Sequence, residues 1–304
     1  MRILVTGGAG FIGSNLAHQL ASLNHEVTVA DDFSSAHWSN LISFKGDIFP
    51  LDIADDITAL TPLAPFEAIY HQASITDTTV IDQRKMMSNV EGFRNILNLA
   101  QQWKSRVIWA GSASVYGKGQ APNRESAAPG PLNVYGYSKL AMEHLADLYR
   151  AKLSRPIIGL RYFNVYGPGE DHKGRFASMV HQLAKQMRAG NRPRVFKSGE
   201  QRRDFVYVGD VVQANLNALE SNQGGSFNVG SGNSWTFNQV VSELNRALKT
   251  HLEPDYFENP YSFTQDWTEA DLTESRRQLK YEPKYDLARG IAAYLASGKL
   301  GVAL

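Results

Sequence analysis

The sequence contains no cysteine, and this absence removes several kinds of chemistry at once. Disulfides, thiolate nucleophiles and cysteine-rich metal sites are excluded. No apolar run approaches the roughly 20 residues that a membrane-spanning helix needs, and the first residues do not form a signal-sequence pattern. We therefore expect a cytoplasmic protein with no membrane partner and no metal site.

The sequence also lacks an excess of charge of either sign. The 304 residues carry a formal net charge of +1, with 43% apolar and 20% charged residues. This balance gives no electrostatic reason for nucleic acid as a main partner, although a local basic pocket can still bind phosphate. The length suits one large domain or two lobes.

The chain begins with a pattern that is typical of nucleotide binding. A strand pattern over residues 2–6 is followed by three glycines spaced G-x-x-G-x-x-G and then by a helical pattern over residues 14–23. Glycines at these positions permit a tight turn and let N–H groups at a helix N-terminus approach a pyrophosphate. We predict that this turn binds a dinucleotide through Gly7, Gly10, Phe11, Ile12 and Gly13.

Two carboxylates follow the second predicted strand, residues 26–30. Asp31 lies where an acid meets the adenosine ribose of a dinucleotide, and Asp32 follows it. No Lys or Arg occurs in residues 33–40, so a 2′-phosphate would have no nearby cation unless Lys45 folds back. The sequence therefore favours NAD as the cofactor, with NADP as the alternative.

Strand and helix patterns then alternate, which indicates a doubly wound parallel sheet of the Rossmann α/β class. Residues 43–47 and 57–60 are harder to assign because prolines break this region into short pieces. The clear strand patterns cover residues 67–71, 106–110 and 156–161, and the helical patterns cover residues 82–103 and 134–152.

A second, smaller α/β lobe is expected to follow residue 168. We divide the chain into a cofactor-binding domain, 1–168, and a mainly substrate-binding lobe, 169–304, with probable crossings of the chain back to the first domain. Helical patterns cover residues 176–189, 210–219 and 236–248, and strand patterns cover residues 205–208 and 226–229. Asp210 and Thr236 occupy positions typical of helix N-caps.

Tyr135 and Lys139 are candidate chemical groups. Four residues apart on a helix, they share one face, and a nearby ammonium favours the charged form of a phenol. Tyr135 is thus a candidate proton-transfer group near neutral pH. By itself the same spacing also occurs in ordinary surface pairs.

Four motifs together resemble the extended short-chain dehydrogenase/reductase family of nucleotide-sugar epimerases and dehydratases, over nearly the whole chain. They are residues 6–13, 112–117, 135–139 and 161–168. The resemblance implies that Tyr135 is the catalytic base, that Ser112 assists it, and that Lys139 binds the nicotinamide ribose. Ser114 offers the same chemistry as Ser112, which is favoured by its motif position. A homo-oligomer is also expected.

Further site residues follow from the same resemblance. The cofactor site would extend to Asp52, Ile53, Gln72, Ala73, Ser74, Asn89 and Val165. A nucleotide-diphosphate sugar would contact Ser112, Asn164, Arg175, Gln182, Phe196, Lys197, Arg203 and Thr264. In this set Arg203, and less securely Lys197, would hold the diphosphate, because a guanidinium can bind it in a bidentate manner.

The substrate is the least settled point. The His-Lys-Gly element at 172–174 resembles the subgroup that epimerises the exocyclic C6 of an ADP-linked heptose, in which Lys173 would be a second acid/base group. Lys173 can equally be a phosphate-binding or solvated loop lysine. Arg175 and Gln182 depart from that subgroup, and residues 259–265 are also similar to UDP-sugar 4-epimerases.

Two other functions are less favoured. A dehydratase would more often carry an Asp-Glu pair directly after the serine, where this chain has Ala113 and Ser114. A noncatalytic nucleotide-binding scaffold is possible because fold alone does not establish activity. The intact set of Ser112, Tyr135 and Lys139 argues against it.

Overall fold

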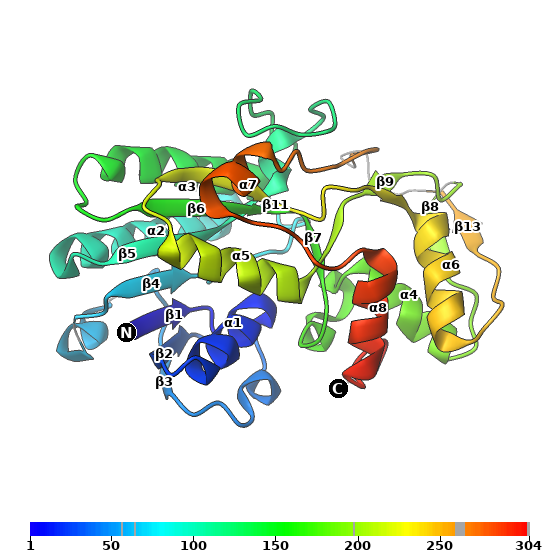
Figure 1. The fold of residues 1–304 in the computed structure, drawn as a ribbon, viewed down its shortest axis with the longest axis horizontal. Helices are drawn as coiled ribbons and strands as arrows, with labels where there is room; N and C mark the ends of the chain where they lie inside the picture. Colours follow the sequence, from blue (N-terminus) through cyan, green and yellow to red (C-terminus); the bar gives the residue numbers. More distant parts are fainter. Residues whose placement is uncertain (56, 64, 197, 259–264, 303–304) are drawn as a thin grey trace.

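A seven-stranded parallel β-sheet forms the centre of the first lobe in the computed structural model (Figure 1), which describes residues 1–304 except 56, 64, 197, 259–264 and 303–304. Every pair of neighbouring strands in it is parallel. From edge to edge the strands are β11 (Gly225–Val229), β6 (Ile157–Tyr162), β5 (Arg106–Ser112), β4 (Ala68–His71), β1 (Arg2–Thr6), β2 (Glu26–Asp31) and β3 (Asp47–Pro50).

Helices cover both faces of this sheet, since successive residues of each strand point to opposite sides. Ile3 and Val5 belong to the apolar core shared with helices α1 and α5, whereas Leu4 belongs to the core shared with α2 and α3. This arrangement confirms the predicted doubly wound α/β fold. The four helices are α1 (Phe11–Ser22), α2 (Gln83–Trp103), α3 (Val134–Arg150) and α5 (Val208–Glu220).

The strand order determines where a ligand can bind. From β1 the chain proceeds to β2 and β3 in one direction, and from β4 to β5 and β6 in the other. In such sheets ligands bind beyond the carboxyl ends of the strands where the order reverses. The segments that follow β1, β4 and β5 therefore meet at one edge of the sheet.

The second lobe consists of three helices and short strand pairs around a separate apolar core (Figure 1). Its helices are α4 (Met179–Arg188), α6 (Phe237–Leu248) and α8 (Leu287–Ala296). The strand pairs are β7 (Asn164–Tyr166) with β10 (Phe205–Tyr207), β8 (Arg194–Phe196) with β13 (Asp255–Phe257), and β9 (Arg202–Arg203) with β12 (Trp235–Thr236).

The chain passes between the lobes more than once. Beyond residue 168, helix α5 packs against α1, and strand β11 joins the edge of the large sheet. Helix α7 (Thr273–Leu279) later packs beside β11. The division of binding roles at residue 168 stays a prediction. Within the described part of the chain, no helix combines the length and apolar character needed to cross a membrane.

Several element ends differ from the sequence predictions. Helix α1 begins at Phe11 rather than residue 14, because Gly10 is its N-cap. Helix α5 begins at Val208, so the N-cap assignment of Asp210 was wrong; its carboxylate instead accepts hydrogen bonds from the N–H groups of Lys284 and Tyr285. The predicted capping by Thr236 is confirmed by a complete capping box.

Candidate active site

The glycine turn after β1 leaves no room for a side chain at Gly7 or Gly13. Gly7 has φ +66°, and a Cβ there would lie 2.4 Å from the backbone nitrogen of Ala73. A Cβ on Gly13 would lie 2.1 Å from the carbonyl oxygen of Gly7. Gly10 caps α1 without a side-chain hydrogen bond. Phe11 and Ile12 are the first residues of α1, so the predicted turn does present a helix N-terminus at the edge where ligands bind.

The two acids after β2 lie beside this turn in different environments. Asp31 is buried, and its carboxylate accepts hydrogen bonds of 2.9 Å from the N–H groups of Ala9 and Phe33. Burial raises the pKa of Asp31. Asp32 is exposed and accepts hydrogen bonds from the N–H and hydroxyl of Ser34. Asp31 therefore braces the glycine turn, and the contact of either acid with a ribose stays a prediction.

The loop after β4 lies against the glycine turn and is held by two side-chain amides, the partly buried Gln72 and the buried Asn89. Gln72 accepts a hydrogen bond from the Tyr162 hydroxyl at 3.1 Å and donates one to Asn215 at 3.3 Å. Asn89 accepts from the N–H of Ile75 at 2.7 Å and donates to its carbonyl at 3.2 Å. Gln72 and Asn89, which the sequence predicts to bind the cofactor, therefore hold this loop in place.

The remaining predicted cofactor residues are spread around the same edge. Ala73 provides the backbone that approaches Gly7. The Ser74 hydroxyl bonds to the carbonyl of Ile75 at 3.4 Å. Asp52 accepts a hydrogen bond from the N–H of Ala54, and Ile53 packs into the core beneath α2.

Ser112, Tyr135 and Lys139 come together from two elements. Ser112 is the last residue of β5, and its hydroxyl oxygen accepts a hydrogen bond from the N–H of Ser114 at 3.1 Å. Tyr135 lies in the first turn of α3, which Asn133 caps, and its hydroxyl is hydrogen-bonded to Ser112. This contact favours Ser112 over Ser114, and the catalytic roles of Ser112 and Tyr135 stay predictions.

Burial dominates the electrostatics of this trio. Lys139 is 1% exposed, and its ammonium donates a hydrogen bond to the carbonyl of Ala110 at 2.8 Å. Burial lowers the pKa of Lys139 to about 7. It raises the pKa of Tyr135, while the hydrogen bond with Ser112 acts in the opposite direction. The lysine and tyrosine thus lie close together, and burial disfavours the charged form of each.

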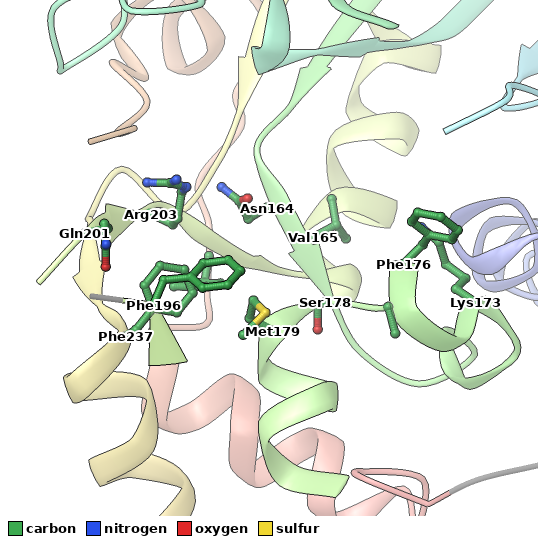
Figure 2. Close-up of a pocket in the computed structure, with 12 residues that line it drawn as sticks. Asn164, Val165, Lys173, Phe176, Ser178, Met179, Phe196, Gln201, Arg203 and Phe237 are labelled. Atoms are coloured by element: carbon green, nitrogen blue, oxygen red, sulfur yellow. The ribbon is translucent and has the colours of Figure 1, made fainter. Parts of the chain in front are cut away.

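A cavity of about 360 Å³ lies in the second lobe, beside strands β7 to β10 and the first residues of α4 and α6. Figure 2 shows Asn164 and Val165 in its middle, with Lys173 on one side and the Phe196 and Phe237 rings on the other. The cavity thus has one end formed by Phe196 and Phe237, called the aromatic end below, and an opposite end where Lys173 lies beside Phe176 (Figure 2).

Arg203 lies at the aromatic end of the cavity. Its guanidinium donates hydrogen bonds to the carbonyl oxygens of Arg202 and Gln265 and lies 5.9 Å from the centre of the Phe237 ring. Burial lowers the pKa of Arg203 to about 10, so the group stays charged at neutral pH. This is a fixed cation of the kind that binds phosphate oxygens.

Lys173 lies at the opposite end, on the 3-10 turn η4 (Asp171–Phe176). Its ammonium is 6.0 Å from the centre of the Phe11 ring, which belongs to the first turn of α1. Burial lowers the pKa of Lys173, and the charge of Glu170 raises it. The sequence left three roles open for Lys173: a second acid/base group, phosphate binding or a solvated loop position. In the structure its ammonium lies beside the first turn of α1.

Three predicted substrate residues do not line the cavity. Ser112 lies at the end of β5. Arg175 is exposed and stacks over the Phe176 ring at 4.6 Å. Gln182 uses its amide to donate hydrogen bonds to the carbonyls of Arg175 and Ala177. Lys197 and Thr264 lie outside the described residues.

Sequence reasoning missed several residues of the cavity wall. Gln201 was not singled out by any sequence pattern. Ser178 was missed because the helix was expected to start at 176, whereas Ser178 is the N-cap of α4. The missed lining residues are Phe176, Ala177, Ser178, Met179, Gln201, Phe205 and Phe237.

The doubly wound sheet, the glycine turn and the Ser112, Tyr135 and Lys139 set define a class: α/β proteins that bind a nicotinamide dinucleotide beside a tyrosine and a lysine. The chain belongs to the NAD dependent epimerase/dehydratase family, whose model matches residues 3–230. This finding confirms the resemblance seen in the sequence.

Similar proteins agree with this placement. The chain is 38% identical to an ADP-L-glycero-D-manno-heptose-6-epimerase of Brachyspira hyodysenteriae over 96% of both chains. It is 40% identical to the solved enzyme of that name from Helicobacter pylori, with a TM-score of 0.91 over 97% of this chain and 95% of the other. A UDP-glucose 4-epimerase from Thermotoga maritima, solved with UDP-glucose, is 30% identical, with a TM-score of 0.92 over 98% and 99% of the chains.

Proposed function

We propose that this protein is an ADP-glycero-manno-heptose 6-epimerase. It would oxidise the exocyclic carbinol of the nucleotide-linked sugar to a ketone and reduce that ketone on its other face. The observation that carries the proposal is the position of Lys173, in the wall of the cavity that also contains Asn164 and Arg203. The names of relatives that are 37–40% identical over almost the entire chain support it.

NAD would supply the redox chemistry, accepting the hydride from the carbinol carbon and returning it. The residues of the first lobe fit this group, because side chains at Gly7 or Gly13 would clash with neighbouring backbone and the N-terminus of α1 carries no side-chain cap. The helix N-terminus would hold the diphosphate, and Asp31 or Asp32 would accept from the adenosine ribose.

Tyr135 would remove the hydroxyl proton during oxidation. Its hydroxyl is already hydrogen-bonded to Ser112, which would also bond to the reacting oxygen of the sugar. The Lys139 ammonium lies 5.8 Å from the centre of the tyrosine ring and favours the phenolate. A lysine with a pKa near 7 can also lose and regain a proton within one catalytic cycle at neutral pH.

Lys173 would act on the other face of the carbonyl. Rotation of a short exocyclic arm presents both faces of its carbonyl carbon to a fixed hydride donor, so a second proton-transfer group across the site is useful. Burial lowers the pKa of Lys173 toward the range in which an amine can both accept and donate a proton. This role rests on the position of the lysine and on the resemblance of residues 172–174.

The opposite end of the cavity suits a nucleotide. The rings of Phe196 and Phe237 offer apolar faces for a base, and Arg203 offers two guanidinium N–H groups for the diphosphate. Replacement of Arg203 by Gln should therefore raise KM more than it lowers kcat.

A UDP-sugar 4-epimerase is the second candidate, and the TM-score of 0.92 to the Thermotoga maritima enzyme favours it. In that reaction the whole sugar ring turns over, so one tyrosine can serve both faces. Mass spectrometry of small molecules released on denaturation, followed by incubation with ADP-D-glycero-D-manno-heptose or UDP-glucose, decides between them. Turnover of UDP-glucose with none of ADP-heptose would refute the first proposal. A homo-oligomer in the cytoplasm stays a prediction.

A further inference from the structure

The turn that carries Lys173 is joined at both ends to one buried carboxylate. Glu170 is 1% exposed, and the N–H of Lys173 donates a hydrogen bond to its carbonyl oxygen at 3.0 Å. One carboxylate oxygen accepts from the N–H of Gly167 at 3.0 Å and from the hydroxyl of Ser178 at 2.9 Å. The other accepts from the N–H of Ser178 at 2.5 Å.

These bonds close a loop between two rigid elements. Gly167 directly follows strand β7, and Ser178 is the N-cap of helix α4. The Glu170 side chain therefore connects the start and the end of the segment between them, which contains η4. With these bonds in place, the backbone at Lys173 has little freedom to move away from Phe11.

Helix α8 supports the same carboxylate from the C-terminal part of the chain. The hydroxyl of Tyr294 is hydrogen-bonded to Glu170 and lies 2.8 Å from Nδ1 of His181. Because this hydroxyl has one proton, donation to the carboxylate requires His181 to donate from Nδ1 to the tyrosine oxygen. A chain of hydrogen bonds thus runs from α4 through α8 to Glu170.

Helix α8 is also fixed against β7. A Cβ added to Gly290 would lie 1.8 Å from the hydroxyl oxygen of Tyr166, so only glycine permits this close approach. The same hydroxyl donates a hydrogen bond to the carbonyl of Leu287 at 3.4 Å. Tyr294 is therefore presented to Glu170 by a helix that cannot easily shift.

We propose that Glu170 is a positioning residue for Lys173: it fixes the turn that carries the lysine, supplies a buried negative charge near its ammonium, and is held in place by Tyr294 of α8. The inference rests on the proposed role of Lys173 as the second acid/base group. Nothing in the arrangement requires Glu170 to touch the substrate.

The electrostatics agree with this geometry. Burial raises the pKa of Glu170 to about 7, although its hydrogen bonds and Lys173 act in the opposite direction. Above this pH the ionised carboxylate favours the ammonium form of Lys173, and below it that support is lost. The titratable groups that surround the pair are Tyr166 on β7, Asp171 and His172 on η4, His181 on α4 and Tyr294 on α8.

Glu170→Gln tests the proposal, with Asp210→Asn as the control. Asp210 is also a buried carboxylate that accepts two backbone hydrogen bonds, but it lies on α5. The pKa of Lys173 is measured on the whole protein by reductive methylation over a pH series and peptide mass spectrometry. We expect Glu170→Gln to lower this pKa by about 1 and Asp210→Asn to leave it unchanged. On ADP-heptose, kcat of Glu170→Gln should fall about 10-fold or more and its pH profile should shift.

Two further variants keep the test decisive if Glu170→Gln folds poorly. Tyr294→Phe removes one hydrogen bond and keeps the charge, so we expect a kcat loss of a few-fold and a smaller fall in the Lys173 pKa. In a Lys173→Met background, Glu170→Gln or Tyr294→Phe should cause no further loss of kcat, because a positioning residue acts only through its target.

An unchanged pKa of Lys173 in both Glu170→Gln and Tyr294→Phe would overturn the inference, as would additive losses in the Lys173→Met background. Failure of the proposed function has a different signature. In that case wild-type protein would leave ADP-heptose unchanged, while the methylation series would still report whether Glu170 controls the lysine.

Discussion

The ammonium of Lys139 lies 5.8 Å from the centre of the Tyr135 ring and is tethered to the carbonyl of Ala110 by a hydrogen bond of 2.8 Å. Ala110 belongs to β5, the strand that ends at Ser112. The lysine therefore ties helix α3 to the strand that supplies the partner of the tyrosine. In the sequence, Tyr135 and Lys139 have an ordinary helical spacing. In the fold they lie where α3 meets β5, the two elements that carry the candidate site.

Tyr135→Phe should reduce epimerisation by about 100-fold or more, because it removes the proton acceptor without changing the ring. Binding of NAD, measured by calorimetry, should change little. Tyr137→Phe is a matched control, since Tyr137 lies on the same helix and is 61% exposed. Near-normal turnover by Tyr135→Phe on a confirmed substrate would remove the tyrosine from its assigned role.

Lys139 should give the cofactor-stripped protein an unusual pH dependence of stability. Burial lowers its pKa from 10.5 to about 7 in the folded chain, so between these values the unfolded chain binds more protons. The free energy of unfolding should then rise by up to about 1.4 kcal/mol per pH unit between pH 7 and 10.5. This gain in stability is lost as the pH falls back through 7.

Lys139→Met should abolish that slope, and Lys152→Met, at an exposed position, should retain it. Urea unfolding of the three proteins between pH 7 and 9 provides the measurement. A wild-type slope equal to that of Lys139→Met would show that Lys139 stays charged in the folded protein.

The sheet and the closeness of Tyr135 to Lys139 were predictable because local patterns encode them, while the catalytic roles of these residues stay predictions. The glycine turn forms from contiguous residues, and Tyr135 and Lys139 share one helix. The cavity wall was less accessible to sequence reasoning, because its members come from loops and strand ends that only tertiary packing brings together. Phe205 and Phe237, for example, lie on β10 and α6, and no sequence pattern marks them as ligand contacts.

Glu170 illustrates the same limit. In the sequence it is one acid in a polar loop, and only the fold shows that Gly167, Ser178 and Tyr294 converge on its carboxylate. The predicted start of α1 was also wrong. We placed the helix after Gly13, the last glycine of the turn, whereas Gly10 is its N-cap.

The cofactor preference follows from the charges after β2. Asp31 and Asp32 would repel a 2′-phosphate, and the nearest lysine in sequence, Lys45, is exposed. Calorimetry on cofactor-stripped protein should show tighter binding of NAD than of NADP. Lys45→Ala should leave the ratio of the two affinities unchanged. Tighter binding of NADP that is lost in Lys45→Ala would show instead that this lysine folds back onto the phosphate.

Lys173→Met addresses whether the enzyme uses one proton-transfer group or two. Methionine keeps much of the side-chain length and its packing near Phe11 but removes the exchangeable proton and the charge. If Lys173 protonates or deprotonates the sugar oxygen on the second face, kcat on ADP-heptose should fall by about 100-fold or more with little change in KM, since the lost interaction belongs to the transition state.

Lys185→Met is the control for Lys173→Met, because Lys185 is an exposed lysine on α4 and should tolerate the change. A lysine that only binds the diphosphate would give the opposite pattern, a raised KM at nearly constant kcat. A partial reaction separates the two further. When a ketone analogue is supplied to Lys173→Met loaded with NADH, it should still be reduced with Tyr135 as the proton donor, so that only one of the two epimers forms. Equal formation of both epimers by this variant would contradict the two-group mechanism and favour a single tyrosine, as in a 4-epimerase.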